Sequence, residues 1–255
     1  MAATYEAYPP DATFSNGGAA ATIPRGQRYF GAASGLLFVV IWIVSLVLPG
    51  AVAPAGVPFP NPIISSSEQI LNYYARAQTA GLLASMLQLS AAFALLCFSA
   101  YATLFVRQAV GGASVLPSLT FGGGILAAGY LALSSLLTWV LTQPGTVERS
   151  DLVRAFYEFI FITGGAAHVA FLGAFAGAVS MAAWSARVLP RWAVWVGLVA
   201  AGIALLSLLT ILWLPASILI LVGRILVFVW IIAICLVAPR TPRPTNRGSE
   251  VEVPV

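Results

Sequence analysis

The sequence has very little charge. Only 8% of its 255 residues are charged, and lysine is absent, so every basic side chain other than the single histidine is an arginine. A soluble globular chain carries roughly 25% charged residues, so a water-exposed surface of the usual kind cannot be made from this composition. Hydrophobic residues make up 60% of the chain and its mean hydropathy is +0.95. These values predict one membrane domain with no separate soluble domain.

Motifs of familiar chemistry are also missing. The two cysteines, Cys97 and Cys235, fall inside apolar runs without C-x-x-C or Cys/His spacing, so we expect small hydrophobes and no metal site. There is no G-x-S-x-G elbow, H-E-x-x-H or dinucleotide fingerprint. The net charge of +4 comes from arginines scattered between apolar runs, which argues against a nucleic-acid partner. We therefore predict no cofactor and a lipid bilayer as the main partner.

Six apolar runs have lengths near or above roughly 20 residues, the length of helix that crosses about 30 Å of hydrocarbon. Each must be helical, because lipid offers no partner to an open backbone group. The predicted fold is all-α, a polytopic transmembrane bundle of about six helices. We expect a disordered tail at 1–28, the membrane domain at 29–238 and a second tail at 239–255. The predicted spans are Tyr29–Leu48, Thr79–Val106, Leu116–Leu141, Phe156–Trp184, Ala193–Leu214 and Ser217–Ala238.

The arginines predict that both termini are cytoplasmic. In that orientation the inner side holds eight arginines, the outer side holds Arg76, Arg149 and Arg154, and Arg224 falls within the sixth span. The triplet Ala51-Val52-Ala53 resembles a signal-peptidase site, but the preceding run is too long and Pro54 follows it, so we expect a retained first helix. Absent lysine beside abundant alanine is typical of GC-rich bacteria, and we expect the bacterial cytoplasmic membrane.

Two predicted outer segments contain polar helix starts. Ser65 and Glu68 have the spacing of a capping box before the second span. Ser150 and Asp151 form a similar polar turn before the fourth. Each segment is interpreted either as a short amphipathic cap at the outer surface or as the beginning of a long helix.

Four polar residues lie in or beside the apolar runs. Arg224 is predicted about nine residues, roughly 13 Å, below the outer surface, where a central arginine costs about 2.5–3.5 kcal/mol. It either snorkels outward, pairs with Glu158, or is solvated in an outward-open cavity. Gln88 lies at a similar depth, where its amide needs a hydrogen-bond partner, either on another helix or in a polar binding site. The single histidine, His168, falls near the midplane, where an interhelical hydrogen bond is favoured over haem ligation or proton relay.

Arg25…Arg28 running into Gly35-Leu36-Leu37, and Ser67-Glu68…Tyr73-Tyr74-Ala75 before the second span, resemble stretches of uncharacterised actinobacterial-type multi-pass membrane proteins. The six-span layout is similar to that of permease subunits of export-type ABC transporters. The resemblance implies a membrane helix bundle and no particular activity.

The leading hypothesis is a non-enzymatic permease-like or complex-forming subunit, whose partner is another membrane subunit or an ATPase. Its outward-facing polar site would draw on Arg224, Glu158, Gln88 and His168. The alternative is a membrane enzyme or redox subunit centred on His168, with haem as its cofactor.

Overall fold

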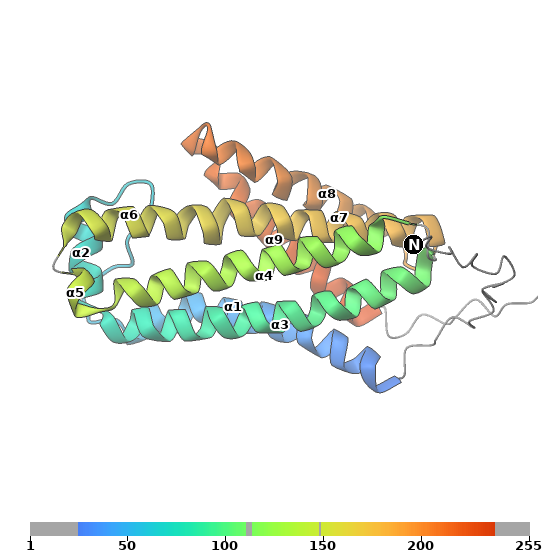
Figure 1. The fold of residues 1–255 in the computed structure, drawn as a ribbon, viewed down its shortest axis with the longest axis horizontal. Coiled ribbons are helices and arrows are strands. Elements are labelled where there is room, and N and C mark those ends of the chain that lie inside the picture. The colour runs from blue at the N-terminus through green and yellow to red at the C-terminus, as the bar shows by residue number, and fades with distance from the viewer. Residues whose placement is uncertain (1–24, 111–113, 148, 238–255) are drawn as a thin grey trace, which may run out of the picture.

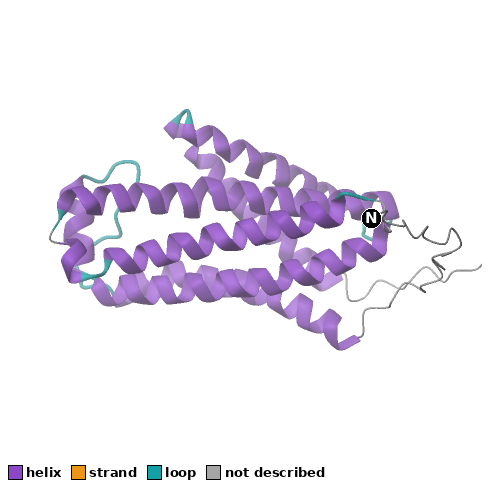
Figure 2. Cartoon of the chain, viewed as in Figure 1, coloured by secondary structure: helices purple, strands orange, loops and turns teal. Residues whose placement is uncertain are grey.

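The computed structural model describes residues 25–110, 114–147 and 149–237, and within these ranges the chain forms helices and no strand (Figures 1 and 2). Most of the tail predicted at 1–28 and all of the tail predicted at 239–255 lie outside the described residues. The boundary at 28 is wrong in one respect, because the first helix already begins at Arg25.

Six helices in the described part of the chain are long and apolar enough to cross a membrane, which confirms the predicted polytopic bundle. The fourth is interrupted by the π-helical turn η1, and the fifth ends in the 3-10 turn η2. The sixth begins with a short 3-10 turn, η3. The bounds are α1 Arg25–Val52, α3 Gln78–Val110, α4 Leu116–Leu141, α6 Ser150–Phe161 with η1 Ile162–Ala167 and α7 His168–Ala186, α8 Arg191–Leu206 with η2 Ser207–Ile211, and η3 Leu214–Ser217 with α9 Ile218–Val237.

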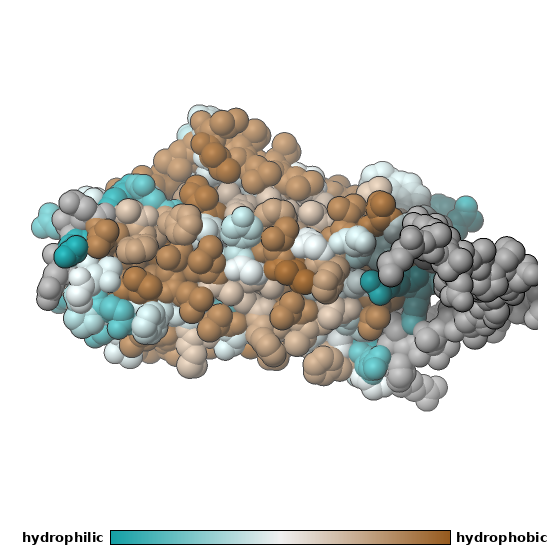
Figure 3. Space-filling view, viewed as in Figure 1, coloured by the Kyte–Doolittle hydropathy of each residue, from teal (hydrophilic) through white to brown (hydrophobic). Residues whose placement is uncertain are grey.

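The longest span exceeds the thickness of a bilayer's hydrocarbon core, and the bundle extends further at one end than at the other. The fourth span, Leu152–Ala186, has 35 residues and is about 52 Å long at 1.5 Å per residue, against roughly 30 Å of hydrocarbon. The α8–α9 hairpin is shorter, and its turn stops well before the end that carries α2 and α5 (Figure 1). We call this the cap end. Brown apolar surface covers the middle of the molecule between more polar ends (Figure 3).

The cap is built on two short helices, α2 (Ser67–Arg76) and α5 (Pro144–Val147), and on the start of α6. Buried apolar and tyrosine side chains form its own small core: Val57, Ile70, Tyr73, Tyr74, Ala77, Ala80, Leu141, Val153 and Tyr157. The connecting loop is tied to α6, because the Tyr157 hydroxyl donates to the Pro60 carbonyl at 2.5 Å and Arg154 Nη1 donates to the Ser65 carbonyl at 3.0 Å.

The capping box of α2 is displaced by one residue from the predicted pair. Ser66 is the N-cap, its hydroxyl accepts from the Gln69 backbone N–H at 3.2 Å, and the Gln69 side chain accepts from the Ser66 N–H at 2.9 Å. The Ser65 hydroxyl instead accepts from the Asn61 N–H at 2.9 Å, so it serves the loop. The predicted pair of Ser65 and Glu68 is therefore wrong by one position.

The two polar helix starts have different outcomes. The first forms a separate cap helix, because α2 ends at Arg76 and the backbone of its C-cap, Ala77, leaves the helical region (φ −110°, ψ 36°). The second begins a long helix, since α6 continues through the π turn into α7 without a break.

Small residues let the long helices approach closely. At Gly123 on α4, an added Cβ would lie 2.9 Å from the backbone nitrogen of Phe175 on α7, which no side chain tolerates without moving a backbone. Gly123 belongs to the run Gly122-Gly123-Gly124, for which packing is the expected role.

Candidate functional site

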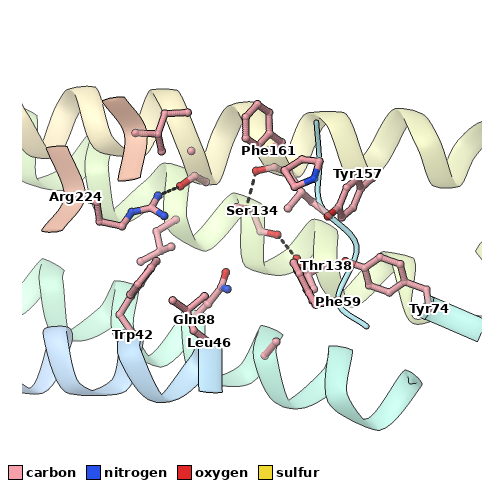
Figure 4. A pocket seen from close by; sticks show the side chains of 17 residues that line it. Trp42, Leu46, Phe59, Tyr74, Gln88, Ser134, Thr138, Tyr157, Phe161 and Arg224 are labelled. Atoms are coloured by element: carbon pink, nitrogen blue, oxygen red, sulfur yellow. Dashed lines mark hydrogen bonds between the residues drawn. The ribbon is translucent and has the colours of Figure 1, made fainter. Parts of the chain in front are cut away.

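A cavity of about 190 Å³ lies between the helices in the cap-end half of the bundle. Its walls come from α1, α3, α4, the α6–η1 segment and α9, and the loop between α1 and α2 covers it (Figure 4). Seventeen side chains or backbone segments line it: Trp42, Leu46, Phe59, Pro62, Tyr74, Ala84, Gln88, Leu131, Ser134, Thr138, Tyr157, Ile160, Phe161, Gly164, Gly165, Ile220 and Arg224.

Arg224 is the only charged side chain among the described residues that line this cavity. It is half-buried. One guanidinium nitrogen, Nη2, donates a hydrogen bond to the Gly164 carbonyl. The guanidinium carbon lies 4.7 Å from the centre of the Trp42 ring, which is cation–π geometry. The Nε atom is buried and has no hydrogen-bond partner in the described part of the chain. Burial keeps Nε away from the cavity itself, so a ligand there would meet the terminal nitrogens of the guanidinium.

The π turn brings Gly164 within reach of this arginine. A π-helical turn widens the helix locally, and such turns are frequent at functional sites. Residue 164 must also be small, because an added Cβ would lie 2.3 Å from the hydroxyl oxygen of Ser134 on α4. The Ser134 hydroxyl donates to the Ile160 carbonyl at 3.2 Å, which joins α4 to α6 just before the turn.

Three uncharged polar side chains accompany Arg224. The amide of Gln88, from α3, points into the cavity across from Arg224 (Figure 4). Ser134 and Thr138 lie on one face of α4, and the Thr138 hydroxyl donates to the Ser134 carbonyl at 2.9 Å. Because both hydroxyls donate to backbone carbonyls, their oxygens remain available as acceptors. The cavity therefore offers charged and amide donors together with hydroxyl acceptors.

Glu158 does not line the cavity. Its carboxylate accepts from Arg154 Nε at 2.6 Å, and 60% of its side chain is exposed. The predicted pairing of Arg224 with Glu158 is therefore wrong. The physical reason is local: Arg154 lies one helical turn before Glu158 on the same face of α6, whereas Arg224 binds a carbonyl further along that helix.

His168 is also outside the cavity. It is completely buried on α7, and its Nδ1 lies 2.8 Å from the Ala127 carbonyl oxygen of α4. The interhelical hydrogen bond expected for it is confirmed. Since a carbonyl only accepts, Nδ1 carries the hydrogen and Nε2 is the bare nitrogen. Nε2 has no partner within the described ranges, and the Phe38 ring packs edge-on at 6.5 Å between ring centres.

The structure thus brings together two of the four predicted site residues, Arg224 and Gln88. The sequence analysis missed Trp42, Gly164, Ser134 and Thr138 as members of the same site. Trp42 carried a usable signal, because it lies well inside an apolar run and not at the membrane boundary where tryptophan is enriched.

Six apolar membrane-length helices, found within residues 25–110, 114–147 and 149–237 and packed around a largely apolar core, make this chain a multi-pass integral membrane protein. No protein-family model, curated protein or solved structure matches it.

Proposed function

We propose that the protein is a non-enzymatic membrane protein, a permease-like or complex-forming subunit, whose cavity binds an anionic group at Arg224. The observation that carries this proposal is the lack of charge compensation. Among the described lining residues no carboxylate accompanies Arg224, and its two partners, the Gly164 carbonyl and the Trp42 ring, are both neutral.

Physical chemistry favours an anion as the missing partner. A half-buried cation within a membrane span that lacks a counter-charge is costly, and such a charge is by default a functional-site hypothesis. A guanidinium is planar and presents several donors that match a carboxylate or a phosphate. One of the five guanidinium donors is bonded to the Gly164 carbonyl, and the Gln88 amide supplies neutral donors nearby.

We further propose that the cap end faces the outside of a bacterial cytoplasmic membrane. The excess of arginine in the segments at the opposite end supports this orientation. In that orientation the cavity lies in the outer half of the bilayer. Another membrane subunit or an ATPase is the expected partner of a complex-forming subunit. Native mass spectrometry of the gently solubilised protein tests for one.

The anion proposal is tested by thermal unfolding in a neutral detergent. Acetate, inorganic phosphate and dodecyl phosphate are added in turn to wild type, to Arg224→Gln and to Arg191→Gln, a control at an exposed arginine that does not line the cavity. We expect at least one anion to raise the melting temperature of wild type and of Arg191→Gln but not of Arg224→Gln. The proposal fails if every anion acts equally on all three proteins.

A further inference from the structure

The cavity is too small for a whole drug-sized ligand. Pockets that enclose such ligands are typically about 300–1,000 Å³, whereas this one is about 190 Å³. A ligand bound at Arg224 is therefore either a small ion or the headgroup of a larger molecule that extends out of the cavity.

One side of the cavity reaches the lipid-facing surface. Leu46 on α1 lines the cavity and is also 56% exposed. Trp42 of α1 contacts α9, because its ring centre lies 5.0 Å from that of Phe228 and Arg224 stacks over it. Beyond this level the axes of the two helices diverge toward the cap end (Figure 1). On the cap-end part of α9, the apolar side chains of Ile218 and Leu221 are more than half exposed.

The route from water passes through the cap. Phe59 and Pro62 of the loop, together with Tyr74 and Tyr157, line the cavity on its cap side, and Phe59 is itself 64% exposed. The hydrogen bond from Tyr157 to the Pro60 carbonyl holds this loop in place. A soluble anion would have to pass between these aromatic side chains, whereas a membrane-resident molecule meets the apolar surface at Leu46 directly.

We infer that the ligand is an anionic amphiphile that enters sideways from the cap-end leaflet, with its headgroup at Arg224 and its tail between α1 and α9. This inference rests on the proposed anion site. The headgroup must move below the membrane surface, because Arg224 lies about nine residues, or roughly 13 Å, beyond the hairpin turn. Arg224, Gln88, Ser134 and Thr138 replace part of the hydration that it loses there.

The test uses dodecyl phosphate as the amphiphile and inorganic phosphate as the soluble anion, with protein held in dodecyl maltoside, whose headgroup is neutral. Native mass spectrometry counts bound molecules over a concentration series. We expect wild type and Arg191→Gln, a control at an exposed arginine that does not line the cavity, to bind one dodecyl phosphate about tenfold or more tightly than Arg224→Gln, the effect of losing one charged hydrogen bond. Inorganic phosphate should not bind measurably.

A pair of variants tests the sideways route without altering the polar residues. Leu46→Trp places a bulkier side chain where the cavity meets the lipid-facing surface, and we expect it to weaken dodecyl phosphate binding severalfold. Its matched control is Val47→Trp, because Val47 is exposed on the same helix and does not line the cavity. This pair also carries the test if Arg224→Gln does not accumulate in the membrane.

The outcomes separate the two proposals. If inorganic phosphate binds in an Arg224-dependent way and dodecyl phosphate binds no better, the anion site stands and the amphiphile inference is overturned. Equal binding of dodecyl phosphate by Leu46→Trp and Val47→Trp overturns the sideways route. If Arg224→Gln binds every probe as wild type does, the anion site itself is wrong and the inference falls with it.

Discussion

Arg224 on α9 donates a hydrogen bond to the Gly164 carbonyl in the π turn that joins α6 to α7, although the two residues are 60 positions apart. The bond places a cation in the cap-end half of a membrane bundle and directs it inward, toward the cavity. It uses one donor of a guanidinium that has five. The Trp42 ring covers one face of the group, and the cavity adjoins it.

The stacking of Arg224 on Trp42 can be measured by a double-mutant cycle. We expect Trp42→Leu and Arg224→Leu to be non-additive, with a coupling of about 0.5–2 kcal/mol, because each substitution removes the same cation–π contact. The measurement is reversible unfolding in mixed micelles. The control cycle pairs Arg224→Leu with Trp195→Leu, since Trp195 packs on Trp184 at 5.0 Å between ring centres. Additivity in both cycles would show that the stacking contributes nothing.

The close approach of α4 and α7 is tested by two adjacent glycines. Gly123→Ala places a methyl 2.9 Å from the Phe175 backbone nitrogen, and we expect a loss of about 1–3 kcal/mol through overpacking. Gly122→Ala is the matched control, because an added Cβ there meets nothing within 4 Å. Unfolding in mixed micelles gives both values. If the two variants are equally stable, the helices can separate at this point without cost.

The number of spans was predictable because each span is a run of about 20 apolar residues, which is visible in the hydropathy of the sequence. The register of the α2 cap was less so, because Ser65, Ser66 and Ser67 are chemically equivalent and Glu68 and Gln69 both suit the third helical position. Only the loop, which engages the Ser65 hydroxyl through the Asn61 N–H, distinguishes them.

The partners of Arg224 could not be predicted from spacing. Trp42 and Gly164 become its neighbours only when the rotation of three separate helices is known. The true partner of Glu158, in contrast, was within reach, because Arg154 precedes it by four residues and such pairs face each other on a helix. In the sequence, the pair Gly164-Gly165 indicates only close helix packing and not a π turn.

The cap should loosen in alkali. Burial raises the pKa of Tyr73 above its ordinary value of about 10, and burial together with the neighbouring Tyr157 and Tyr73 raises that of Tyr74 well above it. When the cap opens, these tyrosines become exposed and lose their protons near pH 10, at a lower pH than in the folded cap. The folded cap is therefore fully stabilised below that pH and becomes progressively less stable above it.

The substitution Tyr74→Phe removes one of the tyrosines that make the stability of the cap depend on alkaline pH. We expect tyrosinate absorbance to show a late-titrating group in the wild type that disappears in the variant, and the near-ultraviolet circular dichroism of the cap to persist to higher pH. The control is Tyr29→Phe, a substitution at an exposed site on α1. An unchanged late phase in Tyr74→Phe would contradict the prediction.

His168 separates the structural interpretation from the redox alternative. Its Nδ1 already donates to the Ala127 carbonyl, so His168→Leu should cost about 0.6 kcal/mol and at most about 1.7 kcal/mol, the range for interhelical hydrogen bonds in membranes. Ser180→Ala is the matched control on α7, since the buried Ser180 hydroxyl has no partner among the described residues and its removal breaks no bond. We expect protein purified in neutral detergent to show no Soret band. A Soret band that is present in wild type and Ser180→Ala but lost in His168→Leu would instead establish His168 as a haem ligand.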